Sequence, residues 1–198
     1  LEQSSTRPKV EVDILGMSWL KEQWKKAAPQ LQKQFGYENV WAVPRVTKVV
    51  LNSGLSGVIR GDAKLAEMVE STLVRITGQK PVRTLARKSI ATFKIRQGMV
   101  VGMKTTLRGH KMDDFLQKLI RVTFARVRDF RGIPRKAVDA HGNLAVGFRE
   151  HIAFPEVRPD EVDKLHGLEI AVTTTAQTQE EGLALFVALG FPMQPEKK

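Results

Sequence analysis

The residues best placed to do chemistry in this chain are the cations of one long basic segment. From Gly78 to Gly98 the sequence reads GQKPVRTLARKSIATFKIRQG, and no acid occurs anywhere between Glu70 and Asp113. Clustered lysines and arginines favour nucleic-acid binding because they neutralise phosphates and release condensed counterions. The cations of the segment are Lys80, Arg83, Arg87, Lys88, Lys94 and Arg96.

The charge of the whole chain indicates the same kind of partner. Its 198 residues include 32 lysines and arginines against 21 acids, which gives a net charge of +11. A chain this basic usually meets a nucleic acid or an anionic membrane surface, and the alternative is a basic protein with no such partner. Many of the acids gather between Glu150 and Glu181, so a basic flank and an acidic flank predict one oriented docking surface. No apolar run reaches the roughly 18–20 residues of a membrane span, and we expect no membrane partner.

The sequence does not predict a catalytic or metal site. Its histidines, His110, His141, His151 and His166, form no HExxH pattern and no close pair with metal-ligand spacing. There is no GxSxG motif and no P-loop, and the basic segment lacks the converging carboxylates of two-metal chemistry. The absence of cysteine excludes disulfides, thiolate metal sites and thiol catalysis. We therefore expect no enzyme, no metal and no cofactor.

The hydrophobic pattern predicts the elements that would position the basic segment. Helical spacing and strand-like alternation alternate along the chain and indicate an α+β fold, an antiparallel sheet with helices packed on one face. The predicted helices are 18–35, 62–77, 113–130 and 178–190, and the predicted strands are 47–54, 89–95, 99–109, 144–148 and 167–175.

Such a fold leaves the second face of the sheet free to bind a partner. Alternation along the strands predicts that Lys48, Asn52, Lys104, Thr106 and Arg108 lie on that face. The single aromatic of the basic segment, Phe93, is expected to point into the core. We therefore expect a duplex or folded RNA read by its shape and backbone more than a single strand read by base stacking. DNA as the ligand, and a solvated hairpin without any ligand, stay open as alternatives.

Five motifs in order resemble those of one ribosomal protein family. They are GQKPVRTLARKSIATFKIRQG (78–98), TLRG (106–109), RVRDFRG (126–132), FPEV (154–157) and TTTAQTQEEG (173–182). From about Met17 to Met193 the chain is similar to the bacterial-type universal ribosomal protein family five of the large subunit, the family that binds 5S rRNA in the central protuberance. The resemblance implies a structural constituent of the ribosome without catalysis, built on an RRM-like split β-α-β sheet.

The resemblance also implies three sets of contacts. In this family 5S rRNA is bound by the exposed sheet face and nearby loops, the loop after the second helix reaches the peptidyl-site tRNA, and the segment after RDFRG forms an intersubunit bridge to a small-subunit head protein. Neighbouring large-subunit rRNA and proteins are further implied partners. The matching positions are Asn52, Gln79 and Thr106 for 5S rRNA, helped by Ser53, Lys80, Lys104 and Arg108; Arg83, Arg87 and Lys88 for tRNA; and Arg135 and Lys136 for the bridge.

The chain departs from the family pattern at two loops and at its start. The usual Met-Gly-Val-Gly turn is replaced by 53–57, and the usual Phe-Asp-Gly-Arg-Gly-Asn-Tyr loop by 138–144, which alters the expected bridge contact. We expect residues 1–16 to be an N-terminal extension and residues 17–198 to be one ribosomal protein domain. Because the chain starts with Leu1 instead of Met, an organellar ribosome, mitochondrial first and plastid second, is slightly favoured over a bacterial one.

Two other functions remain open on the sequence. One is a free-standing RNA-binding or RNA-chaperone module outside the ribosome. The other is an enzyme on the same fold, for instance a nuclease, which metal-dependent cleavage of RNA by the pure protein would reveal.

Overall fold

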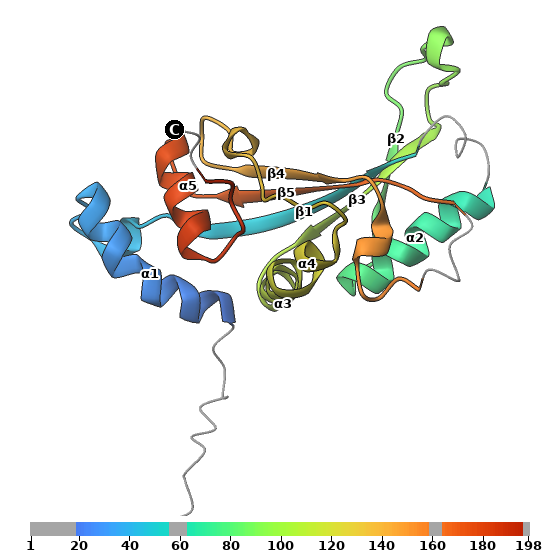
Figure 1. The fold of residues 1–198 in the computed structure, drawn as a ribbon. Helices are drawn as coiled ribbons and strands as arrows, with labels where there is room; N and C mark the ends of the chain where they lie inside the picture. Colours follow the sequence, from blue (N-terminus) through green and yellow to red (C-terminus); the bar gives the residue numbers. More distant parts are fainter. Residues whose placement is uncertain (1–18, 56–62, 159–163, 196–198) are drawn as a thin grey trace, which may run out of the picture.

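The computed structural model describes residues 19–55, 63–158 and 164–195, and these residues form the α+β fold that the sequence predicts (Figure 1). Residues 1–16 lie outside the described residues, so the extension and the single domain over 17–198 stay predictions. The helices and strands are α1 (Trp19–Phe35), β1 (Val46–Gly54), α2 (Ala63–Thr77), β2 (Val82–Leu85), β3 (Val100–Leu107), α3 (His110–Lys118), α4 (Phe124–Arg126), β4 (Leu144–Phe148), β5 (Leu168–Thr174) and α5 (Gln179–Ala188).

The strands form one five-stranded antiparallel sheet in the order β2-β3-β1-β5-β4. When β4 is set aside, the chain order β1-α2-β2-β3-α3-β5 and the spatial order β2-β3-β1-β5 are those of the split β-α-β sheet. The RRM-like arrangement that the resemblance implies is therefore present. The additional strand, β4, extends the sheet at the edge next to β5.

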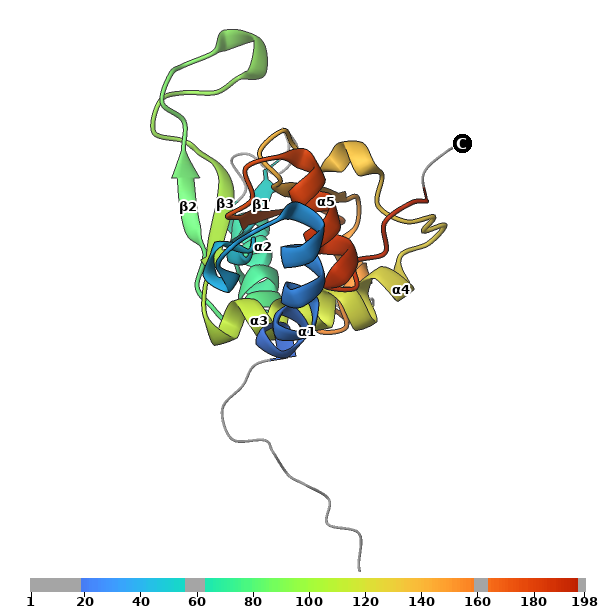
Figure 2. The same cartoon turned by 90° about the vertical axis from the view of Figure 1, so that its left-hand side faces the viewer.

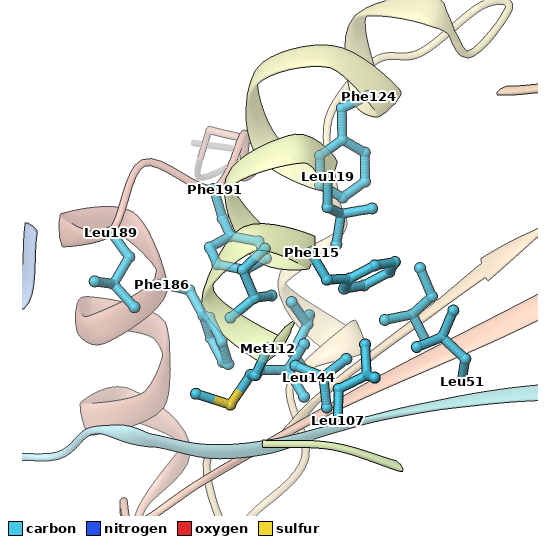
Figure 3. Packing of buried hydrophobic residues seen from close by; sticks show 14 of the residues in the cluster. Leu51, Leu107, Met112, Phe115, Leu119, Phe124, Leu144, Phe186, Leu189 and Phe191 are labelled. Atoms are coloured by element: carbon cyan, nitrogen blue, oxygen red, sulfur yellow. The ribbon is translucent and has the colours of Figure 1, made fainter. Parts of the chain in front are cut away.

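One face of the sheet is covered by helices because alternate strand residues are apolar. Leu51 of β1 and Leu107 of β3 are fully buried and point toward Met112 and Phe115 of α3 (Figure 3). Burial of an apolar side chain of this size stabilises the fold by roughly 1.5–3 kcal/mol. In Figures 1 and 2, α2 and the α3–α4 helix lie on the same side of the sheet. The opposite face is thereby left uncovered by these helices.

The third predicted helix is displaced toward the N-terminus. Helical spacing predicts 113–130, but the helix runs over 110–126 and contains a π-helical segment at Leu119–Thr123. The chain leaves the helix after residue 126, and this turn stacks Phe130 on Phe124 with their ring centroids 5.1 Å apart. Aromatic packing therefore ends the helix earlier than its hydrophobic pattern indicates.

The strand predicted over 89–95 is wrong. The strand in this region is Val82–Leu85, and residues 89–95 form the tip of a hairpin that stands away from the rest of the molecule in both views (Figures 1 and 2). The β-branched residues of the tip alternate as in a strand, but Ile90 and Ile95 pair with each other across a 3₁₀ turn. The alternation therefore marks a tight turn that contacts no further strand of the described sheet.

Candidate nucleic-acid interface

The uncovered face of the sheet, called the free face below, carries polar side chains in a row across β3, β1 and β5. The register places Asn52 of β1 between Lys104 of β3 and Glu169 of β5, and all three residues are exposed. Amide and ammonium groups donate hydrogen bonds to the phosphates and sugars of nucleic acids. The β3–β1 half of the row therefore suits RNA, whereas the carboxylate of Glu169 repels it.

The next row of the free face consists of short side chains. Thr106 pairs with Val50, Val50 with Ala171, and Ala171 with Ala145. None of these side chains extends far from the sheet, so the surface is shallow and an RNA helix can approach the strands closely. The hydroxyl of Thr106 is the hydrogen-bonding group at the β3 end of this row.

Gln79 lies at the same end of the free face because α2 stops just before it. The left-handed backbone of Gly78 (φ +62) ends the helix, and the Thr77 hydroxyl donates to the Leu73 carbonyl oxygen at 2.6 Å. The Gln79 side-chain amide then donates to the Thr106 carbonyl oxygen at 3.3 Å. Asn52, Lys104, Thr106 and Gln79, which the resemblance assigns to 5S rRNA, are thus gathered on one surface, with Lys80 and Arg108 exposed beside them.

Ser53 does not belong to this surface, and its predicted RNA contact is corrected. Its side chain points to the helix-covered side, where the residue has 0% exposure and its hydroxyl donates to the Gly167 carbonyl oxygen at 3.0 Å. The cause is the alternation of the strand, since the neighbour of an outward residue such as Asn52 points inward.

Arg83 lies at the root of the β2–β3 hairpin, and the structure separates it from the other two cations predicted to contact tRNA. Its Nη2 and Nε atoms donate to a carboxylate oxygen of Glu70 on α2 at 2.6 and 3.1 Å. The Arg83 guanidinium, and more weakly Lys80 with its Nζ 3.8 Å from Glu70, hold the pKa of the Glu70 carboxyl below its usual range against the opposing effect of burial. Arg83 therefore ties β2 to α2.

Arg87 and Lys88 are exposed in the projecting part of the hairpin, which has a defined backbone. Two hydrogen bonds between Ile90 and Ile95, of 2.9 and 3.1 Å, close its tip. Phe93, expected in the core, is 61% exposed in this tip. The prediction is wrong because the tip stands away from the sheet and has no core to enter. The hairpin thus combines cations with an exposed aromatic ring.

The candidate bridge residues lie at the other edge of the sheet. Arg135 and Lys136 are exposed in a 3₁₀ turn, Arg135–Ala137, that contacts β4. Since β2 and β4 are the two edge strands, the sheet separates these cations from the hairpin.

The altered loop 138–144 is ordered by its own hydrogen bonds. One carboxylate oxygen of Asp139 accepts from the backbone N–H groups of His141 and Asn143 at 2.9 and 2.7 Å, and the other accepts from the Asn143 side-chain amide at 2.9 Å. Burial by itself raises the pKa of Asp139, but the hydrogen bonds from Asn143 and His141 outweigh it and lower that pKa below its usual range. The loop therefore keeps a fixed shape without the family's usual residues.

The TTTAQTQEEG motif holds this loop in place. The hydroxyl of Thr174 donates to the Gly142 carbonyl oxygen at 2.8 Å, and its backbone N–H donates to the Asn143 side-chain oxygen at 3.0 Å. Gly182 of α5 lies so close that a Cβ built on it would be 2.4 Å from the Gly142 Cα. The motif thus has a packing role in addition to any role in binding.

His151 and His166 stack on each other inside the protein, with ring centroids 3.9 Å apart and an interplanar angle of 6°. Burial, followed by the charge of His151, lowers the pKa of His166 to about 4, and burial also lowers the pKa of His151. Parallel rings do not converge on one ion, so this pair is structural. Within the described ranges no cluster of three or more His, Asp and Glu side chains could hold a metal ion, and no helix there is long and apolar enough to cross a membrane.

Sequence reasoning missed a second exposed aromatic residue, Trp41. Its side chain is 75% exposed in a 3₁₀ turn, Val40–Ala42, between α1 and β1. The run VWAV, which Asn39 and Pro44 bound, is too short to form a helix or strand that would give the ring a buried face. A short apolar run between an asparagine and a proline is therefore the sequence signal that could have predicted the exposed Trp41.

Comparison with known proteins finds one family over most of the chain. The family model described as Ribosomal protein L5 matches residues 39–96, and the model for the C-terminus of the same ribosomal family matches residues 100–193. The protein named large ribosomal subunit protein uL5 of Halothermothrix orenii is 52% identical over 177 residues, which is 89% of this chain and 98% of that protein.

Two further relatives carry the same name. The one from Thermus thermophilus is 47% identical over 180 residues, covering 91% of this chain and 98% of its own length. The one from Colwellia psychrerythraea is 50% identical over 165 residues, covering 83% and 91%. All three organisms are bacteria, so the expectation of an organellar ribosome is not supported.

Proposed function

Because this chain belongs to the ribosomal protein L5 family, we propose that it binds 5S rRNA in the central protuberance through the β3–β1 half of its free face. As a member of the family it is a structural constituent of the large ribosomal subunit, has rRNA and ribosomal proteins as partners, and is not an enzyme. Family membership also favours the ribosome over a free-standing RNA-binding module.

The observation that carries the proposal is the grouping of Asn52, Lys104, Thr106 and Gln79 on a shallow surface. The minor groove of A-form RNA is wide and shallow and displays 2′-hydroxyls and base edges, which amide and hydroxyl groups can bind. The ammonium group of Lys104 neutralises a phosphate next to them. A shallow face with few, short, polar groups fits a folded RNA better than a single strand.

We further propose that the exposed part of the hairpin contacts the peptidyl-site tRNA. Arg87 and Lys88 support this proposal because they are exposed and project from the sheet together with the tip. Arg83 has a different part, since its ion pair with Glu70 anchors the hairpin to α2. The intersubunit bridge is assigned to Arg135 and Lys136 at the opposite edge of the sheet.

The 5S contact is tested by gel shifts of the full chain with 5S rRNA and with an unrelated RNA duplex at near-physiological salt. Asn52→Ala or Thr106→Ala is expected to weaken 5S binding by roughly three- to tenfold, the effect of losing one hydrogen bond. Thr92→Ala removes the same hydroxyl from the hairpin tip and is the matched control. Equal affinity for both RNAs would exclude specific recognition, and loss of 5S binding in Arg87→Ala alone would show that the two surfaces are interchanged.

A further inference from the structure

A cavity of about 520 Å³ opens where α1 meets the beginning of β1 and of α3, outside the free face. Its volume lies within the roughly 300–1,000 Å³ of small-ligand sites. Its wall is largely apolar, with a few charged groups at defined places. The lining residues used below are Trp24, Trp41, Lys21, Arg45, Gly109 and Asp113.

Hydrogen bonds hold the indole ring of Trp24 and the turn that carries Trp41. The backbone N–H of Trp41 donates to the Asn39 side-chain oxygen at 2.9 Å, which caps the 3₁₀ turn that carries the ring. The indole N–H of Trp24 donates to the Pro44 carbonyl oxygen at 2.8 Å. Trp41 thus places a 75% exposed ring at the cavity, and exposed aromatic rings bind nucleobases by stacking.

The charges around the cavity suit an RNA. Lys21 and Arg45 are exposed at its rim and can neutralise phosphates. Asp113 lines the wall of the cavity and is 4% exposed. An ionised carboxylate only accepts hydrogen bonds, so its natural partner is a donor group such as an exocyclic amine of a base.

The cavity lies at the end of the sheet where β3 ends and β1 begins. Gly109 lines it and directly follows Arg108 at the end of β3, and the first residues of β1, Val46 and Thr47, also line it. An RNA that lies along β1 and β3 therefore reaches the end of the sheet at which the cavity lies. This location means that the inference below rests on the proposed RNA-binding function of the free face.

We infer that the cavity receives one unpaired nucleobase of the RNA bound to the free face, stacked on Trp41 and hydrogen-bonded through its amino group to Asp113. Lys21 and Arg45 hold the flanking phosphates. Guanine, adenine and cytosine carry an exocyclic amino group, whereas uracil has no amino group and offers only its N3–H, which lies between two carbonyl oxygens that the carboxylate repels. The site is thus selective against uridine, which backbone contacts on the sheet cannot achieve.

The test uses the full chain and labelled RNA hairpins that differ in one bulged nucleotide, with binding followed by fluorescence anisotropy at about 0.15 M salt. Hairpins with a bulged guanosine, adenosine or cytidine are expected to bind about tenfold more tightly than those with uridine or no bulge. Trp41→Ala removes this advantage and Trp41→Phe retains most of it. Asp113→Asn narrows the difference between cytidine and uridine, because the amide can donate to a uracil carbonyl.

Phe93→Ala is the matched control, since Phe93 is the other exposed aromatic in a basic setting. Loss of the bulge advantage in Phe93→Ala but not in Trp41→Ala would place the base at the hairpin tip and overturn the inference. Equal binding of all hairpins by the unaltered protein would also overturn it. If Asn52→Ala still weakens 5S binding in that case, the free-face proposal stands and the cavity inference alone fails.

The occupant is identified in assembled particles. Ultraviolet irradiation of purified large subunits, followed by mass spectrometry, is expected to link the peptide containing Trp41 to a nucleotide. A link to a peptide of a neighbouring protein, or to the chain's own residues 1–18, would show that protein and not RNA fills the cavity. Either result would overturn the inference.

Discussion

Gly142 lies where the 138–144 loop touches α5, and Gly142→Ala is expected to lower the free energy of unfolding by about 2–5 kcal/mol. An added Cβ would lie 2.6 Å from the Ala176 Cβ and 2.8 Å from the Thr178 carbonyl oxygen, well inside contact distance. The left-handed backbone of Gly142 (φ +72) costs an L side chain roughly 1–2 kcal/mol. Overpacking in so tight a place adds roughly 1–3 kcal/mol.

Gly36→Ala is the control that separates the two costs. Gly36 has almost the same backbone conformation (φ +69), but no atom lies within 4 Å of an added Cβ. Gly36→Ala is therefore expected to lower the free energy of unfolding only by the cost of the left-handed backbone, about 1–2 kcal/mol. Urea unfolding followed by circular dichroism measures both variants by linear extrapolation. Equal losses, within about 0.5 kcal/mol, would refute the close approach of the loop to α5.

Two further predictions concern pH and the edges of the sheet. Burial and the neighbouring histidine lower the pKa of His166 from 6.5 to about 4. Between these pH values the unfolded chain therefore binds more protons than the folded chain. The contribution of His166 to the free energy of unfolding is complete above pH 6.5 and is smaller by about 2 kcal/mol at pH 5. Urea unfolding above pH 6.5 and at pH 5 should show that the free energy of unfolding depends less on pH in His166→Gln than in the unaltered chain. An unchanged pH dependence would contradict its assignment to His166. Ribosomes with Arg87→Ala and Lys88→Ala should hold peptidyl-site tRNA more weakly in filter binding, whereas Arg135→Ala and Lys136→Ala should weaken subunit association in light scattering. The reverse pattern would show that the two edges were assigned the wrong way round.

The strands of the free face could be predicted because their side chains alternate. Met103, Thr105 and Leu107 point inward and Lys104 points outward, as the period of two requires. The same rule removes Ser53 from the RNA contacts, because a residue next to the outward Asn52 must point inward. Family matching alone includes Ser53, since it considers position along the chain and not the direction of the side chain.

The hairpin could not be predicted in the same way. Alternating β-branched residues indicate an extended backbone, but they do not indicate whether a second strand lies beside it. Phe93 is expected in the core because aromatic rings are usually buried, and the projecting tip removes that option. Trp41 gives no periodic signal because a turn of three residues has no period at all.

The edge strand β2 has a consequence for the protein before it is assembled. Val82 and Leu85 are 64% and 57% exposed on this strand, and an exposed apolar edge is a template for pairing with another chain. Cations next to such an edge oppose that pairing by mutual repulsion. Arg87 and Lys88 follow β2 closely, so we expect the charges proposed to contact tRNA also to oppose pairing between copies of the chain before RNA is bound.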